Sequence, residues 1–227
     1  TLSKQLASSS KGLAKWDISA ANAAGESSFT LVETLQDAVN EIGQTQPDTH
    51  YAYAAELEQA LETGLTLTLH NGDTMTYAQA KDAGVITVTY YSGANGTGGT
   101  VTATDPSIRV QSFTIQVNKE DDNPVRRVDV TGIPTHQDRS KVPTGENWTY
   151  KNSVSIQGTS KSATAEGSYK SFEKRVAAES DKDESKYQGG DQTYQYGKLS
   201  GKNLHYQLVV QTAAEDDDDI VFTDTLP

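Results

Sequence analysis

The sequence contains no cysteine among its 227 residues, so neither a disulfide framework nor a thiolate metal site can stabilise the fold. Any covalent reinforcement must therefore use other side chains. No apolar run approaches the length of a membrane span, and we expect no direct membrane insertion. Basic residues are scarce, with 19 Lys and Arg against 31 Asp and Glu. Nucleic acid is not an expected partner, because its phosphates require clustered cations.

The residues that remain are typical of a β-protein, rich in Thr, Ser, Val, Tyr and Gly. Short runs of alternating apolar and polar residues are separated by turn residues, which predicts a sandwich or barrel of antiparallel strands. The strands expected in the first part are Leu2–Leu6, Lys15–Ala21, Ser28–Leu35, Leu65–His70, Val85–Tyr91, Ile108–Asn118, Arg126–Gly132 and Asn147–Ile156.

A helical segment interrupts the strand pattern. Apolar residues recur at helical spacing from Tyr53 to Leu61, Gly64 is a stop signal, and Asp48 or Thr49 is the predicted cap. A shorter helix is predicted over Tyr77–Asp82. Both helices are expected to pack across an open end of the β-structure.

The chain is long enough for two domains. Residues 158–168 are rich in Gly, Ser, Thr, Lys and Ala without apolar alternation, which predicts a linker. The expected organisation is a complete domain over 1–157, this linker, and a second domain over 169–227. Further strands are expected at Ser171–Ala177, Asn203–Thr212 and Ile220–Leu226.

Three strands of the first domain carry a polar residue on an otherwise apolar face. Residues two apart share a face of a strand, so Lys4 falls between Leu2 and Leu6. By the same parity, Glu33 shares a face with apolar residues of its strand, and Asn152 shares one with Tyr150, Val154 and their neighbours. Burying any one of these groups unpaired costs several kcal/mol, so we expect the three to meet.

Such a meeting permits covalent chemistry. Burial favours the neutral amine of Lys4 and the protonated acid of Glu33, which prepares a nucleophile and a proton donor. The acid can polarise the Asn152 carbonyl, and attack by the amine would expel ammonia and leave an amide crosslink. A buried Lys–Glu salt bridge with Asn as a hydrogen-bonding neighbour is the alternative, and strand parity alone does not separate the two.

The second part of the chain repeats this pattern. Lys174 stands between Phe172 and Val176, and Asp224 lies in the apolar segment from Ile220 to Leu226. Two occurrences of an inward lysine followed by an inward acid favour the crosslink over the salt bridge.

These segments resemble the isopeptide-forming immunoglobulin-like domains of Gram-positive adhesins and pilins, of the type first described in collagen-binding adhesins. The similar segments are Leu2-Ser3-Lys4, which opens the first domain, Thr30 to Leu35, which carries the acid, Tyr150-Lys151-Asn152-Ser153-Val154, which closes it, and Val221 to Pro227, which resembles the acid segment of a second domain. The resemblance implies an all-β, immunoglobulin-like antiparallel β-sandwich with a short helical insertion, a Lys4–Asn152 isopeptide bond and Glu33 as its proton shuttle.

Two features depart from the family pattern. Glu33 stands where Asp is more frequent. The sequence ends just after Asp224, so the second domain is expected to lack its closing strands. Lys174 and Asp224 then have no partner within this chain unless another chain completes the domain.

The resemblance implies a cell-wall-attached, extracellular surface protein that binds a host extracellular-matrix protein or a surface glycan. A pilin backbone or spacer domain with no ligand of its own is a second hypothesis. A carbohydrate-binding accessory module of a secreted enzyme is a third, and it requires exposed aromatics, for which Tyr90, Tyr91, Tyr187, Tyr194 and Tyr196 are the candidates. We expect no cofactor, no metal site and no enzymatic turnover beyond the single self-reaction.

Overall fold

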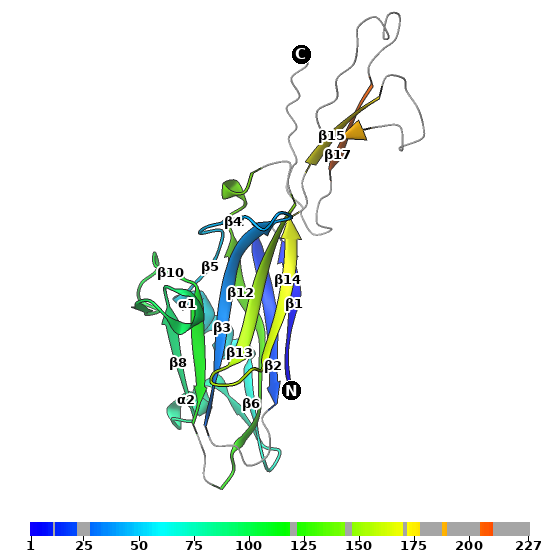
Figure 1. Cartoon of the computed structure of the whole chain (residues 1–227). Coiled ribbons are helices and arrows are strands. Elements are labelled where there is room, and N and C mark those ends of the chain that lie inside the picture. Colours follow the sequence, from blue (N-terminus) through cyan, green and yellow to red (C-terminus); the bar gives the residue numbers. More distant parts are fainter. Residues whose placement is uncertain are drawn as a thin grey trace, which may run out of the picture.

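The computed structural model describes residues 1–10, 12–21, 28–118, 122–143, 147–169, 172–177, 188–189 and 205–210 (Figure 1). Within these ranges two antiparallel sheets pack face to face, and a small third sheet follows them along the chain. The expected all-β, immunoglobulin-like sandwich with a short helical insertion is thereby confirmed.

The first sheet begins at the N-terminal strand and runs in the order β1, β2, β12, β5 and β10, with β6 also pairing β12 and β7 pairing β6. Its strands are β1 (Leu2–Ser10), β2 (Leu13–Ala21), β5 (His50–Tyr53), β6 (Leu65–Leu69), β7 (Thr74–Thr76), β10 (Arg109–Val110) and β12 (Val125–Gln137). Alternation along β2 buries every second residue, so one face of this sheet forms half of the core.

The second sheet runs in the order β14, β13, β3, β11, β8 and β9, with β4 pairing β3. Its strands are β3 (Phe29–Asn40), β4 (Thr45–Gln46), β8 (Ile86–Tyr91), β9 (Thr100–Val101), β11 (Ser112–Val117), β13 (Trp148–Ile156) and β14 (Ser162–Tyr169). The long strand β3 lies between β11 and β13, which places its inward residues at the centre of the sandwich.

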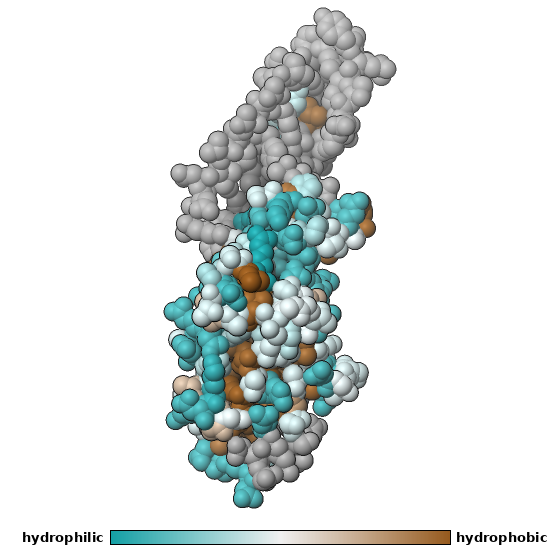
Figure 2. All heavy atoms as spheres, turned by 90° about the vertical axis from the view of Figure 1, so that its left-hand side faces the viewer, coloured by the Kyte–Doolittle hydropathy of each residue, from teal (hydrophilic) through white to brown (hydrophobic). Residues whose placement is uncertain are grey.

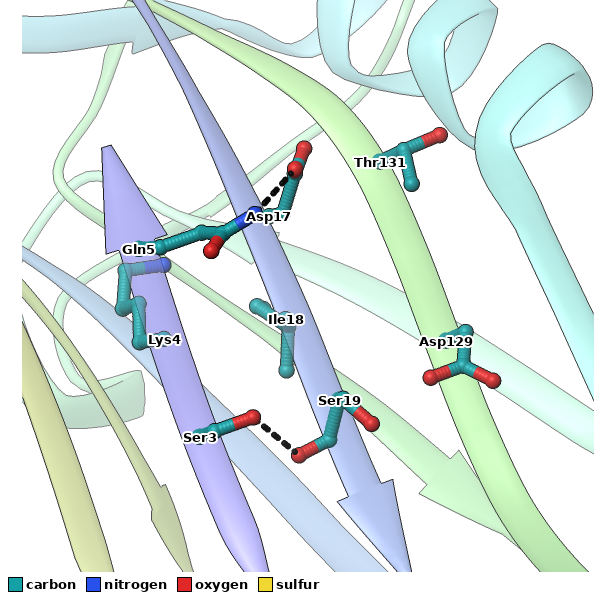
Figure 3. A pocket seen from close by; sticks show the side chains of 8 residues that line it. All are labelled: Ser3, Lys4, Gln5, Asp17, Ile18, Ser19, Asp129 and Thr131. Atoms are coloured by element: carbon teal, nitrogen blue, oxygen red, sulfur yellow. Dashed lines mark hydrogen bonds between the residues drawn. The ribbon is translucent and has the colours of Figure 1, made fainter. Parts of the chain in front are cut away.

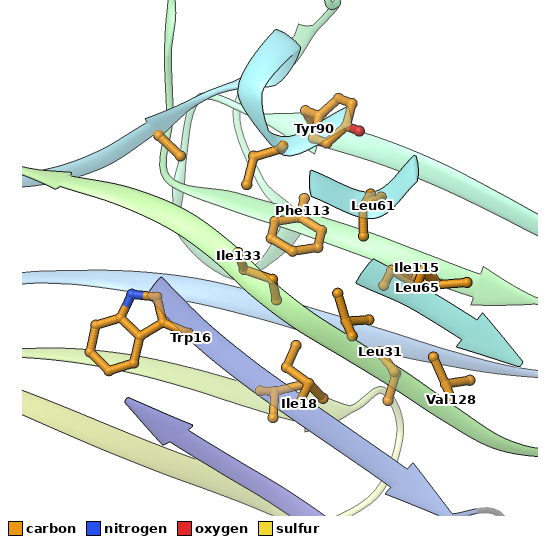
Figure 4. Packing of buried hydrophobic residues seen from close by; sticks show 14 of the residues in the cluster. Trp16, Ile18, Leu31, Leu61, Leu65, Tyr90, Phe113, Ile115, Val128 and Ile133 are labelled. Carbon is orange, nitrogen blue, oxygen red and sulfur yellow. The ribbon is translucent and has the colours of Figure 1, made fainter. Parts of the chain in front are cut away.

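The inserted helix α1 (Ala54–Gly64) occupies part of a strand position in the first sheet. Strand β5 pairs one end of β12 and β6 pairs the other, and α1 joins β5 to β6 alongside β12. Its buried residues Ala54, Leu57 and Leu61 complete the core where strand pairing is interrupted. Figure 4 shows Leu61 among Phe113, Ile115 and other core side chains.

Strand β12 adapts to the helix with a bulge. Its register shifts between Val130 and Ile133, and Gly132 adopts a φ of 73°, which glycine accommodates without steric cost. The freed amide of Gly132 donates to Asp17 Oδ1 at 2.9 Å. A side chain at Gly64 would lie 2.2 Å from the Thr131 carbonyl oxygen, so the end of α1 approaches this bulge too closely for any residue but glycine.

The predicted N-cap of this helix is wrong. The helix begins at Ala54 with Tyr53 in the cap position, and the predicted caps precede β5 instead. Asp48 has a φ of 57° in a turn, and the Thr49 hydroxyl accepts the amide of Ala38. The capping group that a helix normally recruits is therefore already used to attach β5 to β3.

The second helix, α2 (Tyr77–Asp82), has the bounds that the sequence predicts and begins with a capping box between Thr76 and Gln79. It is fastened to α1 and β8 through Glu58. Lys81 Nζ donates to Glu58 Oε1 and the Tyr90 hydroxyl to Glu58 Oε2, each at 2.5 Å. Figure 2 shows the side of the molecule on which α1, α2 and β8 lie, where a band of hydrophobic residues is flanked by hydrophilic ones.

A loop after β8 folds back over the outer face of the second sheet and contains the 3₁₀ turn η1 (Ala94–Gly96). The Thr34 hydroxyl donates to Asn95 Oδ1 at 3.1 Å, and Gly96 N donates to Ser112 Oγ at 2.8 Å. Thr34 and Ser112 are buried for this reason although Thr34 points away from the core. A second 3₁₀ turn, η2 (Arg139–Lys141), follows β12.

The stretch 158–168 is not a linker. Most of it belongs to β14, which pairs with β13 from Ser155 and Ser162 to Trp148 and Tyr169. The first sandwich therefore extends past the predicted boundary at residue 157. Beyond it the structure describes β15 (Phe172–Ala177), β16 (Gln188–Gly189) and β17 (His205–Val210), which form the third sheet. The predicted strand Ile220–Leu226 lies outside the described residues.

Candidate functional site

The Lys4 side chain leaves the edge strand β1 and enters the sandwich. Lys4 pairs with Ile18 of β2, which is buried, so the two residues share the inward face. The Lys4 side chain has no solvent exposure, although its neighbours Leu2 and Leu6 are only half-buried. Its Nζ donates to Glu33 Oε1 and lies 5.8 Å from the centroid of the Trp16 ring.

Glu33 is the acid at the centre of the core. Its residue is 1% exposed, and Leu31 and Leu35 beside it on β3 are equally buried. Burial raises the pKa of Glu33, against the smaller opposing effect of the Lys4 charge. Burial likewise lowers the pKa of Lys4, against the attraction of Glu33. Both shifts favour the uncharged forms, a free amine beside a protonated carboxyl group.

Asn152 reaches the same place from β13. Asn152 pairs with Leu35 and Val154 pairs with Glu33, so Asn152 and Glu33 are diagonal neighbours on one face of adjacent strands. Asn152 has no exposed surface, and its side chain contributes to the pKa of Glu33. Among the described residues, Asn152 Nδ2, Asn152 Oδ1 and Glu33 Oε2 complete no hydrogen bond of normal geometry. The Asn152 and Glu33 side chains thus interact, but not through a well-aligned hydrogen bond.

Aromatic side chains enclose this group. Trp16 and Tyr150 are in edge-to-face contact with ring centroids 5.9 Å apart, and both are fully buried. The Tyr150 hydroxyl is 3.1 Å from Ser9 Oγ of β1, which closes the side of the sandwich where β1 faces β13 and β14. Water is thereby excluded from the amine, acid and carboxamide, which strengthens their mutual interactions.

Gly167 leaves space for the Tyr150 ring, which together with Trp16 forms the aromatic wall of the site. Sequence reasoning did not single this glycine out. It pairs with Tyr150 across β13 and β14, and a Cβ there would lie 2.3 Å from the Tyr150 hydroxyl oxygen. The ring therefore lies over the glycine. The sequence offered only the small residues at every second position, Ala163, Ala165 and Gly167, as a signal.

His50 is a second residue beside the site that the sequence did not reveal. It is completely buried, and its ring contacts both Tyr150 and Trp16 with centroids 5.3 and 5.9 Å away. Burial lowers the pKa of His50 to about 4, so the ring is neutral at physiological pH. Its partners come from distant strands, which is why its sequence context carried no signal.

The remaining predicted sites can be placed only in part. Lys174 lies in β15 opposite Leu208 of β17, and Asp224 lies outside the described residues. Within the described part of the chain, no group of three or more His, Asp or Glu residues could hold a metal ion. None of the helices within the described ranges has the length and hydropathy that a membrane span requires.

The outer face of β1 and β2, opposite the core, is polar (Figure 3). Gln5 Nε2 donates to Asp17 Oδ2 at 3.0 Å, and Ser3 donates to the Ser19 carbonyl. These residues line a shallow pocket with Asp129 and Thr131 of β12. The buried amine of Lys4 therefore lies on the inner face of β1, and hydrogen-bonding groups cover the outer one.

The fold and the site together define a class, an immunoglobulin-like sandwich whose core holds an amine, a carboxyl group and a carboxamide in one enclosed cluster. No protein-family model matches the chain, and no curated protein matches its sequence.

The chain is similar, at low identity, to several solved structures. ACE19, the collagen binding subdomain of Enterococcus faecalis surface protein ACE, is 6% identical with a TM-score of 0.33, over 73% of this chain and 93% of that one. Collagen adhesin (CNA) from S. aureus is 8% identical with a TM-score of 0.34, over 74% of this chain and 48% of that one. A structure described as BspA_C_WT is 8% identical with a TM-score of 0.29, over 68% and 42%. None of these likenesses assigns a ligand to this chain.

Proposed function

We propose that this chain is a load-bearing domain of a bacterial surface adhesin, and that an intramolecular isopeptide bond between Lys4 and Asn152 reinforces it. The observation that carries the proposal is the burial of Lys4, Glu33 and Asn152 in one enclosed cluster, with Lys4 bonded to Glu33. The reaction occurs once per chain and gives no enzymatic turnover.

The chemistry needs only these three side chains. The neutral Lys4 Nζ attacks Cγ of Asn152 while the protonated Glu33 donates to Oδ1, which stabilises the tetrahedral intermediate. Glu33 then takes a proton from Nζ and delivers it to Nδ2. The Cγ–Nδ2 bond breaks, ammonia leaves, and the proton on Oδ1 returns to Glu33, so that an Nζ–Cγ amide remains with Glu33 again protonated. No oxidant, cofactor or external base takes part.

The imperfect hydrogen bonding at the site supports this reaction over a permanent salt bridge. In a salt bridge with Asn152 as neighbour, the amide and the second carboxyl oxygen should form well-aligned hydrogen bonds, because each buried orphan costs about 1–3 kcal/mol. Asn152 interacts with the Glu33 carboxyl group, but among the described residues Asn152 Nδ2, Asn152 Oδ1 and Glu33 Oε2 form no hydrogen bond of normal geometry. Condensation removes Nδ2 altogether and leaves an amide oxygen that a protonated Glu33 can bond.

Adhesion is proposed from the family resemblance of the Lys4, Glu33 and Asn152 segments. The proposed partner is a host extracellular-matrix protein or a surface glycan, and the proposed location is the cell wall, outside the cell. A spacer domain without a ligand is the second candidate, since the crosslink itself serves a stalk equally well. The inserted helix α1 and the loop around η1 are elaborations beyond a plain sandwich, which favours adhesion.

Tyr90, one of the aromatic residues that the carbohydrate-module hypothesis requires to be exposed, is buried. Tyr90 is 6% exposed, and its hydroxyl bonds Glu58, so it cannot present a face to a sugar. Tyr91 is half-buried, and Tyr187, Tyr194 and Tyr196 lie outside the described residues.

Intact-mass measurement of the purified full chain tests the bond. We expect a mass lower than the sequence mass by one ammonia, and the full mass in Lys4→Met and in Asn152→Leu. Lys15→Met is the matched control, because Lys15 lies on the neighbouring strand but faces solvent, and it should retain the deficit. A wild-type chain of full mass would refute the crosslink.

Adhesion needs a separate measurement. The full chain should bind immobilised collagen, fibrinogen or an array of host glycans, and an uncrosslinked Lys4→Met chain should bind with the same affinity in the absence of force. Absence of binding to every one of these surfaces would favour the spacer.

A further inference from the structure

His50 joins the two sheets through the middle of the core. It belongs to β5 of the first sheet, and its Nδ1 lies 2.9 Å from the carbonyl oxygen of Gln36 on β3 of the second sheet. Its Nε2 lies 2.8 Å from Thr135 Oγ1 of β12, which also receives Trp16 Nε1 at 2.8 Å. A chain of hydrogen bonds thus runs from Trp16 through Thr135 and His50 to β3.

Each hydrogen bond of this network has only one possible donor and one possible acceptor. A carbonyl oxygen only accepts, so the His50 proton is on Nδ1 and Nε2 is an acceptor. An indole N–H only donates, so Thr135 accepts from Trp16 and gives its own proton to His50. The imidazole is therefore held as one neutral tautomer, with both nitrogens satisfied. This is a fully connected buried network, which fixes its strands in a single arrangement.

The hydrogen-bond network reaches β3 at Gln36, where β3 pairs with β13, the strand that carries Asn152. Gln36 pairs with Lys151, and the next pair is Leu35 with Asn152. The β3–β13 register is irregular between Thr149 and Lys151, immediately beside this attachment. A one-residue slip would turn Asn152 away from the core, because the side-chain period of a strand is two.

The other end of the network, the Trp16 ring, lies beside the Lys4 amine. The Trp16 ring that bonds Thr135 is the ring over which the Lys4 Nζ lies, at 5.8 Å. His50 also packs edge-on against Tyr150, two residues before Asn152. One residue thus has contacts leading to the strand of the acid, the strand of the carboxamide and the ring beside the amine, without touching any reacting atom itself.

We propose that His50 is the positioning residue of the crosslinking site, holding β3 and β13 in the register that sets Asn152 against Glu33 and holding Trp16 beneath the Lys4 amine. The inference rests on the proposed isopeptide function and adds the residue that organises it. Loss of the Nδ1–H bond to Gln36 loosens the alignment of amine and carboxamide, and small misplacements of reacting groups cost up to about 10²-fold in rate.

The test follows condensation in time. Full-length chains are made by cell-free translation, synthesis is stopped, and samples quenched in denaturant at intervals are measured by intact mass. His50→Leu removes both hydrogen bonds, and His50→Asn keeps an N–H near the place of Nδ1. Leu61→Ala is a control that destabilises the core from α1 without touching the network. Folding itself is timed by Trp fluorescence in a Lys4→Met background, with and without His50→Leu.

We expect ammonia loss in His50→Leu to be on the order of 10²-fold slower than in wild type, with folding slowed far less. His50→Asn should recover most of the rate, and Leu61→Ala should react as fast as wild type once folded. The inference is overturned if His50→Leu reacts at the wild-type rate, if Leu61→Ala is equally slow, or if His50→Asn recovers nothing. A wild-type chain that never loses ammonia refutes the proposed function instead.

Discussion

The Lys4 amine donates a hydrogen bond to the Glu33 carboxyl group inside the sandwich, although the two residues belong to different sheets and are separated by 29 positions in sequence. Neither side chain has appreciable contact with water, since their exposures are 0% and 2%. In such an enclosed ion pair, the Coulombic attraction offsets only part of the desolvation penalty of the two charges. Conversion of the pair to a neutral amine and acid would remove that penalty, and it is the state that the proposed condensation requires.

Removal of the acid should stop the crosslink while leaving its two ends in place. In Glu33→Gln the carboxamide cannot shuttle a proton, so we expect the full sequence mass. The closed loop from Lys4 to Asn152 is lost, which by analogy with disulfides lowers the free energy of unfolding by about 5 kcal/mol. Urea unfolding measures this loss. Glu33→Asp should restore the mass deficit, and a deficit persisting in Glu33→Gln would contradict the role of the acid.

His50 should make stability depend on pH in a defined window. Its folded pKa is about 4 and its ordinary value 6.5, because burial disfavours the charged ring. Between these values the unfolded chain binds a proton that the folded chain does not, so stability is lost as pH falls from 6.5 toward 4, by at most about 3 kcal/mol.

The comparison of wild type with His50→Asn isolates this effect from the carboxylates. The difference in their unfolding free energies should shrink as pH falls through the window, since only wild type has the histidine to protonate. His70→Asn is the control, because His70 is exposed, and it should run parallel to wild type. A constant difference between wild type and His50→Asn from pH 7 to 4 would show that His50 does not titrate as described.

Gly64→Ala tests the insertion of α1 beside β12. The added Cβ would meet the Thr131 carbonyl oxygen at 2.2 Å, so the helix end or the bulge must move. We expect a loss of about 1–3 kcal/mol, typical of overpacking. Gly99→Ala is the matched control, where the nearest atom is 3.8 Å away, and it should change stability by no more than about 0.5 kcal/mol. Equal thermal midpoints for the two variants would contradict the close approach.

Gly167→Ala should disturb the aromatic wall from behind. The new Cβ would lie 2.4 Å from Cζ of Tyr150, forcing the ring toward His50, at an expected cost of about 1–3 kcal/mol. In a Tyr150→Leu background the same substitution should cost much less, because the clash is gone. A double-mutant cycle from urea unfolding gives the coupling, and additive effects would mean that ring and glycine do not interact.

Strand parity alone directed attention to Lys4, Glu33 and Asn152, because the two-residue period of a strand is a local property that a sequence displays. Which strands pair is not local. The sequence could not show that β3 and β13 are neighbours, or that His50 reaches Gln36 across the core, since these partners are brought together only by the fold.

The stretch 158–168 shows how a strand can escape prediction. Its inward positions Ala163, Ala165 and Gly167 are small, because Tyr150 and its neighbours on β13 fill the space beside them. The apolar alternation is present in side-chain size but weak in hydropathy, and composition alone indicated a linker. The large side chains of β13 fill the space that the small residues of β14 leave open.

Strand β14 follows Asn152 in the sequence, so a bond from Lys4 to Asn152 would leave it outside the covalent ring. Pulling on the two ends of the sandwich would then separate β14 from β13 while everything between the bonded residues stayed folded. The segment from Ser153 to Tyr169 could lengthen by roughly 4 nm before the amide bore the load, since its two ends already lie about five strand residues apart in the folded hairpin. With the proposed bond in place, such an extension would dissipate part of a sudden pulling force, and β14 would pair with β13 again when the force is released, while the residues between Lys4 and Asn152 stayed folded.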